Sequence, residues 1–218
     1  MEVEIWSDIA CPWCYIGKRR FEAALGQFEH RNDVNVTWRS FELDPGAPLE
    51  RTGDRAERLA QKYGMTVEQA RDAERQLTSV ATGEGLTFRF DIARSGITFD
   101  AHRLVHLAET YDLQDAMKER LLQAYFTEGE LMSDHDTLVR MALEVGLEER
   151  EVREMLVGER YADEVRADER IAGELGISAV PTFVVDRKLG ISGAQRPDVL
   201  LDLLCQGWVK RSSASALA

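Results

Sequence analysis

The sequence predicts an α/β fold in which the two ends of the chain form one mixed sheet and a large all-helical insertion separates them. Three observations support this fold class. Residues 3–38 follow a strand–helix–strand pattern, residues 180–208 follow a strand–strand–helix pattern, and residues 53–175 show helical spacing of apolar residues with no proline. A β-α-β unit aligns two strands in parallel and a β-β-α unit adds an antiparallel pair, so both ends can share one sheet.

The N-terminal unit is predicted from its periodicity. Residues 3–7 alternate in part between apolar and polar side chains, which favours a strand. Apolar residues from 15 to 28 then recur at helical spacing. Residues 34–38 alternate strictly and predict a half-buried strand, and two prolines within residues 43–48 end the regular structure.

The insertion and the C-terminal unit follow from the same signals. Glycine-containing breaks divide residues 53–175 into about six predicted helices. Residues 180–185 and 189–192 are predicted strands, and Pro197 lies near the start of the final helix, where its missing N–H costs little. We therefore predict a discontinuous domain of residues 1–45 and 176–211, a helical insertion domain of residues 46–175, and a flexible tail at residues 212–218.

Composition argues against several functional classes. The chain has 218 residues, a formal net charge of −12 and a pI of about 4.9. It lacks the basic footprint of a nucleic-acid-binding protein, and its charge disfavours an anionic membrane. No stretch approaches the roughly 18 apolar residues that span a bilayer, and the N-terminus lacks the basic segment of a signal peptide. We expect a cytoplasmic protein.

The strongest chemical signal is the dithiol Cys11-Pro12-Trp13-Cys14, located where the first strand ends and the first helix begins. Proline is tolerated in a first helical turn. Here Cys11 meets the unpaired N–H groups and positive dipole end of the helix, which we expect to lower its thiol pKa. The spacing brings Cys14 onto the same turn, so Cys11 can attack a disulfide and Cys14 can resolve the mixed disulfide.

Three other interpretations of the cysteine pair stay open: half of a zinc site, two inert buried thiols, or the site of a glutathione-using isomerase or transferase. A zinc site needs two further ligands and no second C-x-x-C occurs, so we expect no metal. Cys205 belongs to the apolar face of the final helix and is expected in the core rather than as a redox partner. The remaining ligand candidates are Cys205, His30, His102, His106 and His135.

Pro181 opens the predicted strand that follows Val180. A proline cannot donate to a strand ladder, so it belongs at an edge or beside a group that must approach closely. A cis Val180–Pro181 bond would turn the backbone of Val180 toward a substrate peptide, available for strand-like pairing. Local sequence by itself favours an ordinary trans proline, and the cis bond is favoured only in combination with the dithiol motif.

Four further side chains are candidates for the site. Asp8 precedes Cys11 by three residues and is either a proton acceptor or a helix-capping carboxylate. His102 and His106 stand four apart on a predicted helix, a spacing that can hold a metal. No H-E-x-x-H motif or third ligand accompanies them, so solvated or hydrogen-bonded histidines are favoured. Trp13 is expected to be exposed, as an apolar contact for a substrate chain.

The run from Ser7 to Cys14 resembles the DsbA-type thioredoxin-fold proteins of the FrnE-like branch. The resemblance implies a thioredoxin fold split by an all-helical insertion, a cis Pro181 lying against Cys11, and His102 and Arg103 facing the substrate groove. Related 2-hydroxychromene-2-carboxylate isomerases and kappa-class glutathione transferases generally carry serine in place of Cys11, and serine cannot form a mixed disulfide. The blocks that extend the resemblance along the chain are residues 101–104, 125–129, 176–183 and 191–195.

These features predict a thiol–disulfide oxidoreductase or disulfide isomerase. No bound cofactor is expected; glutathione or a thioredoxin-type system would supply electrons, protein or peptide disulfides would be the substrates, and the chain would be a monomer or homodimer. A glutathione-dependent isomerase or transferase for an aromatic or polyketide molecule and a non-catalytic holdase-like binding module are the alternatives. The predicted catalytic residues are Cys11 and Cys14, with an active-site wall of Pro12, Trp13, Val180 and Pro181.

Overall fold

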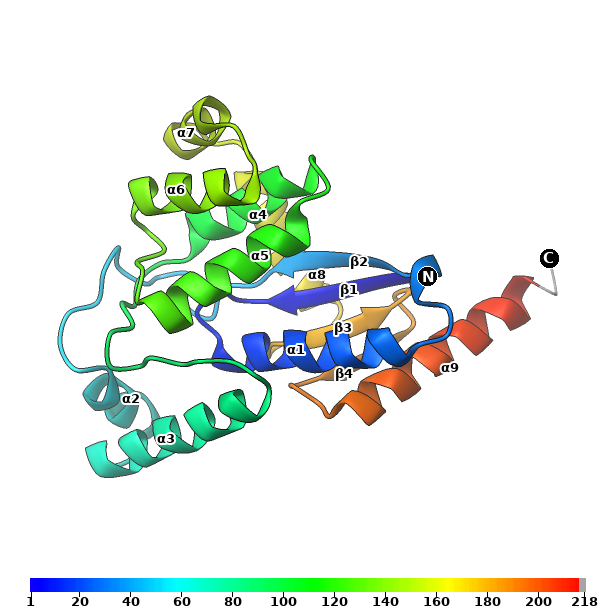
Figure 1. Ribbon diagram of the computed structural model, residues 1–218, viewed down its shortest axis with the longest axis horizontal. Coiled ribbons are helices and arrows are strands. Elements are labelled where there is room, and N and C mark those ends of the chain that lie inside the picture. The colour runs from blue at the N-terminus through cyan, green and yellow to red at the C-terminus, as the bar shows by residue number, and fades with distance from the viewer. Residues whose placement is uncertain (216–218) are drawn as a thin grey trace.

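The computed structural model describes residues 1–215, and the side chains of residues 1–211. Within these residues a four-stranded sheet of order β2-β1-β3-β4 forms the centre of the molecule (Figure 1). Strand β1 (Glu2–Ser7) pairs in parallel with β2 (Asn35–Ser40) and antiparallel with β3 (Thr182–Val185), which pairs antiparallel with β4 (Leu189–Ser192). The predicted mixed sheet built from both ends of the chain is confirmed.

Helices account for most of the remaining chain (Figure 1). A 3₁₀ turn precedes β2, and a π-helical turn at Ala124–Glu128 continues one of the insertion helices. The α-helices, in chain order, are α1 (Pro12–Gln27), α2 (Arg55–Tyr63), α3 (Val67–Gly83), α4 (Phe99–Glu109), α5 (Gln114–Gln123), α6 (His135–Val145), α7 (Glu149–Val157), α8 (Ala162–Glu174) and α9 (Pro197–Ser215).

Side chains of β1 enter two different layers. Val3 and Ile5 belong to the main core, together with residues of α1 and α9, which pack against each other. Trp6 points to the opposite face and packs with Ala172 of α8. Successive side chains of a strand point to opposite faces, so a strand buried on both sides shows only the partial alternation seen in the sequence.

The insertion is helical as predicted, and much of it is continuous with the core of the sheet. Residues of α4, α5, α6 and α7 share the main hydrophobic cluster with β1 and α1. Helices α2 and α3 have a small cluster of their own, centred on Ala56, Ala60 and Ala70. Predicted breaks at Gly64 and Gly146 are confirmed, since both adopt left-handed backbone angles, with φ of 65° and 107°. The exact domain limits stay a prediction.

One expectation for the last helix was wrong. Cys205 is exposed rather than in the core, because it follows the buried Leu204 and is rotated by about 100° around the helix axis. Helix α9 continues through Ser215, and the flexibility of the tail at residues 212–218 stays a prediction. Residues 216–218 lie outside the described residues. Among residues 1–215, no helix is long and apolar enough to cross a membrane.

Candidate active site

The first cysteine of the motif starts helix α1. Cys11 is the N-cap residue, with extended backbone angles (φ −92°, ψ 110°), and Pro12 occupies the first turn as predicted. The backbone N–H of Cys14 donates to the carbonyl of Cys11 at 3.0 Å, which closes this turn. Cys11 is 4% exposed and Cys14 is fully buried. The first thiol therefore lies at the margin of the surface and the second directly beneath it.

The opposing wall comes from the loop before β3. The Val180–Pro181 peptide bond is cis, and the sulfur of Cys11 lies 3.6 Å from the carbonyl oxygen of Val180. Helix α1 approaches this loop so closely that a β-carbon placed on Gly17 would stand 2.8 Å from Cγ of Pro181. The fold thus brings together two motifs that are 169 residues apart in the chain.

The sequence predicts a lowered pKa for the thiol of Cys11, but the surroundings of this thiol in the fold raise its pKa. The hydrogen bond with Cys14, burial of the thiol and the negative charge of Asp8 raise the pKa of Cys11 well above its ordinary value. The sequence argument considered the α1 terminus by itself and omitted these three influences.

Asp8 is a buried anchor and does not cap α1. Its carboxylate accepts hydrogen bonds from the hydroxyl of Thr98 at 3.0 Å and from the backbone N–H of Leu43 at 2.8 Å. The backbone N–H of Ala10 and the ring of His102 lie at 3.2 and 3.3 Å. Burial opposes the charge, but the hydrogen bonds from His102, Leu43 and Ala10 hold the pKa of Asp8 below its ordinary value of 3.8. The carboxylate ties the dithiol loop to two other segments.

The two histidines of α4 are buried and serve different partners. His102 contacts Asp8, and burial lowers its imidazole pKa below 6.5, so a neutral ring donates to the carboxylate near pH 7. His106 lies 3.1 Å from both the hydroxyl of Ser40 and a carboxylate oxygen of Asp168. Among the described residues, no group of three or more His, Cys, Asp or Glu side chains is placed to hold a metal ion.

The expectation that Arg103 faces a substrate groove was wrong. Its guanidinium is buried and donates to backbone carbonyls of Met155, Gly158 and Arg160 and to the carboxylate of Asp100. Carbonyls at the end of a helix lack intrahelical partners, and an arginine fork can satisfy several of them. Arg103 therefore joins α4 to the end of α7 and contributes no contact to the dithiol.

Trp13 lies at the surface between the two buried thiols. Its side chain is 44% exposed, as predicted. The loop of residues 175–179 and strands β3 and β4 line a cleft of about 380 Å³, and neither cysteine nor Val180 contributes to its lining.

Two buried side chains next to the site carried no signal in the sequence. The ammonium of Lys118, on α5, donates to the carbonyl of Ser7 at 3.1 Å and is 1% exposed. Glu42 is buried near Asp8, and burial raises its pKa to about 7 although Arg166 opposes this. From the sequence alone a lysine or a glutamate is expected at the solvated surface. Only long-range packing buries these two side chains.

A family model, the DSBA-like thioredoxin domain, matches residues 2–205. The chain belongs to the DsbA-like thioredoxin family. A probable DsbA oxidoreductase from Streptomyces coelicolor has a similar structure, with a TM-score of 0.91 and 47% identity over 95% of this chain and 90% of its own. The uncharacterized protein YwbO of Bacillus subtilis (strain 168) is 28% identical over 211 residues, 91% of this chain and 93% of its own.

A more distant likeness concerns the fold. The cytosolic disulfide reductase DsbM from Pseudomonas aeruginosa, solved with GSH, has a TM-score of 0.67 and 19% identity over 94% of this chain and 98% of its own. The predicted family and its fold, a thioredoxin domain with helical additions, are confirmed. The DsbA-like family also makes this chain a redox enzyme in general terms.

Proposed function

We propose that this protein exchanges disulfides of protein or peptide substrates through Cys11 and Cys14. The observation that carries the proposal is the position of the Cys11 sulfur, 3.6 Å from the carbonyl of Val180 with Cys14 in the same turn of helix. A substrate chain paired with the backbone of Val180 would present its disulfide to Cys11. The resolving thiol is then within the same turn of helix.

The exchange has two steps. The thiolate of Cys11 attacks one substrate sulfur, which forms a mixed disulfide and releases the other substrate sulfur as a thiolate that takes up a proton. Cys14 loses its proton and attacks the sulfur of Cys11, which forms the Cys11–Cys14 disulfide and releases the second substrate thiol. Two electrons pass from the dithiol to the substrate, and the same steps in reverse oxidise a substrate dithiol.

Asp8 and His102 hold the loop that carries Cys11 in place. Four hydrogen bonds fix the Asp8 carboxylate, so it holds the loop that carries Cys11, and its charge favours the protonated thiol. His102 keeps the carboxylate in place. We assign both residues a positioning role.

Glutathione is the proposed electron donor, and the cytoplasm the proposed location. The DsbM structure was solved with GSH, which supports a small thiol as a partner of this fold. Two glutathione molecules would reduce the Cys11–Cys14 disulfide and become one oxidised glutathione. This direction suits the cytoplasm, where glutathione keeps thiols reduced.

The deciding experiment uses Cys14→Ser on a Cys205→Ser background, because the exposed thiol of Cys205 would otherwise collect adducts. Mixed disulfides on Cys11 should accumulate and be identified by mass spectrometry. Cys11→Ala should lower insulin reduction at least a hundredfold, whereas Cys205→Ser should leave it unchanged. Insulin reduction by Cys11→Ala at the wild-type rate would refute the proposal.

The same variants separate the alternatives. A glutathione-dependent isomerase or transferase would show saturable glutathione binding and turnover that survives Cys14→Ser. A holdase-like module would protect clients equally well without either thiol.

A further inference from the structure

Two buried lysines lie near one indole ring. The ammonium groups of Lys18 on α1 and Lys118 on α5 each lie 5.7 Å from the ring centroid of Trp38, and each side chain is 1% exposed. A buried ammonium is costly unless negative groups compensate its charge. The two lysines differ in what supplies that compensation.

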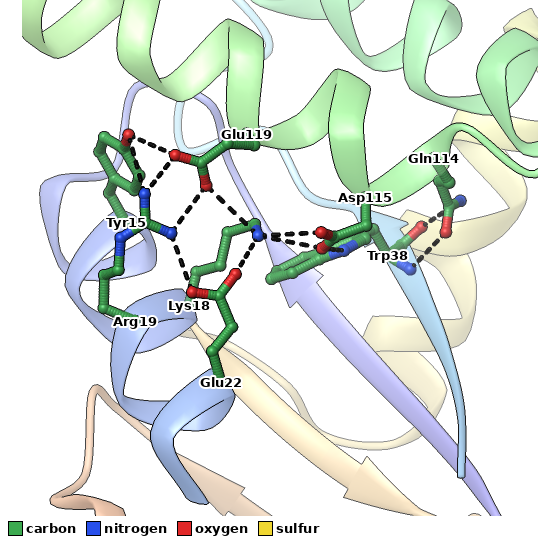
Figure 2. Close-up of polar contacts among 8 residues, drawn as sticks. All are labelled: Tyr15, Lys18, Arg19, Glu22, Trp38, Gln114, Asp115 and Glu119. Atoms are coloured by element: carbon green, nitrogen blue, oxygen red, sulfur yellow. Dashed lines mark hydrogen bonds and ion pairs between the residues drawn. The ribbon is translucent and has the colours of Figure 1, made fainter. Parts of the chain in front are cut away.

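Lys18 is surrounded by carboxylates (Figure 2). Its ammonium forms ion pairs with Glu22, with Asp115 at 3.1 Å and with Glu119 at 3.3 Å. Although burial works against the charge, Asp115 and Glu22 raise the pKa of Lys18 above its ordinary value. This lysine is fully paired within the interface between α1 and α5.

Lys118 has no such partner. Among the described residues, no carboxylate oxygen lies within 4 Å of its ammonium, whose hydrogen bond goes to the carbonyl of Ser7 at 3.1 Å. Ser7 is the last residue of β1 and is bonded directly to Asp8, in the loop that leads to Cys11. The ammonium therefore lies at the base of the dithiol loop.

The titratable groups that interact with the charge of Lys118 come from α1, from the loop before it and from α4. Cys14 and Cys11 of α1 and Asp8 favour its charged form, whereas Lys18 opposes it. His102 of α4 is also within range of its charge. Burial outweighs these influences and lowers the pKa of Lys118 to about 8. The negative groups available to compensate it are the Asp8 carboxylate and whichever cysteine is ionised.

We propose that Lys118 is a positioning residue that stabilises the thiolate of the Cys11–Cys14 pair, so that α5 of the insertion sets the redox balance of the site. This inference rests on the proposed function of the dithiol. When two glutathione thiols reduce the Cys11–Cys14 disulfide, oxidised glutathione and one proton leave, one cysteine takes up the second proton, and the other keeps a negative charge near the ammonium. Stabilising that thiolate favours the reduced form and makes the disulfide more oxidising. The ammonium also opposes the effect of Asp8 on Cys11.

The test compares Lys118→Met with Lys18→Met, which removes an equally buried lysine from the same indole. The alkylation rate of Cys11 by iodoacetamide is followed against pH in the Cys14→Ser, Cys205→Ser background. In the chain that retains Cys11 and Cys14, the equilibrium with reduced and oxidised glutathione is measured at a pH above the alkylation midpoint, where the thiolate is populated. Lys118→Met should move the alkylation midpoint upward by about one pH unit or more and shift the glutathione equilibrium at least about tenfold toward the disulfide. Lys18→Met should move the alkylation midpoint by less than about 0.3 pH unit and change the glutathione equilibrium less than twofold.

A second variant separates charge from folding. Lys118→Gln keeps a donor for the carbonyl of Ser7 but removes the charge, so it should reproduce the shifts of Lys118→Met, and it replaces that variant if the methionine protein does not fold. Unchanged alkylation and glutathione equilibria in Lys118→Gln, or equal shifts in Lys18→Met, would overturn the inference. Thiol titration does not require turnover, so failure of the proposed function would appear separately, as absence of mixed disulfides in Cys14→Ser.

Discussion

Replacing Gly17 by alanine tests whether the contact between α1 and the loop before β3 is as close as the structure shows. An added β-carbon would stand 2.8 Å from Cγ of Pro181 and 3.5 Å from the ring of Phe183. Carbon atoms pack at about 3.5–4.0 Å, so the loop or the helix must move by more than half an ångström. Overpacking of this kind costs about 1–3 kcal/mol.

The same substitution also has a stabilising effect, because it removes a glycine from a helix. Glycine inside a helix is about 1 kcal/mol less favourable than alanine. The net expectation for Gly17→Ala is a loss of up to about 2 kcal/mol in the free energy of unfolding, with no gain. Because the displaced Pro181 adjoins Val180, whose carbonyl contacts the sulfur of Cys11, alkylation of Cys11 should change as well.

Gly26 provides the matched control. It lies in the same helix, and a β-carbon there would meet no atom within 4 Å. Gly26→Ala should therefore raise the free energy of unfolding by about 0.5–1 kcal/mol and leave the reactivity of Cys11 unchanged. Urea unfolding followed by tryptophan fluorescence measures both variants. If Gly17→Ala gains as much stability as Gly26→Ala, the close contact is refuted.

Three further predictions concern other parts of the molecule. Burial works against a charge on His106, but hydrogen bonds to Asp168 and Glu109 raise its pKa from 6.5 to about 9. The charged ring therefore contributes about 3 kcal/mol to the free energy of unfolding. This contribution is complete below pH 6.5 and is lost as the pH rises through 9. His106→Gln should flatten the unfolding free energy over that range, and an unchanged pH profile would contradict this. Trp13→Ala should alter the unfolding free energy by less than about 0.5 kcal/mol yet slow insulin reduction severalfold, because the ring is 44% exposed beside the thiols; an equal rate would exclude it from substrate contact. Cys205→Ser should leave stability within about 0.5 kcal/mol, as measured by thermal unfolding, whereas a loss of 2 kcal/mol or more would mean that the thiol is in the core.

The sequence and the structure agree best where local patterns suffice. Alternation of side chains predicted the two N-terminal strands, and glycine positions such as Gly64 and Gly146 predicted ends of helices, because turn geometry depends on the residue itself. The mistaken placement of Cys205 shows the limit of periodicity. One residue of rotation around a helix separates a buried position from an exposed one, and side-chain type alone does not specify it.

The same distinction between local pattern and long-range packing applies to the candidate site. The Cys11–Cys14 motif by itself predicted either dithiol exchange or half of a metal site, because two thiols three residues apart at the start of a helix suit both. Only the tertiary structure decided the direction in which the pKa of Cys11 is shifted. Asp8 and Cys14 raise the pKa of Cys11, and Lys118 reaches the loop from a helix more than a hundred residues away. Charges act through space, and which charges meet depends on long-range packing that no local pattern specifies.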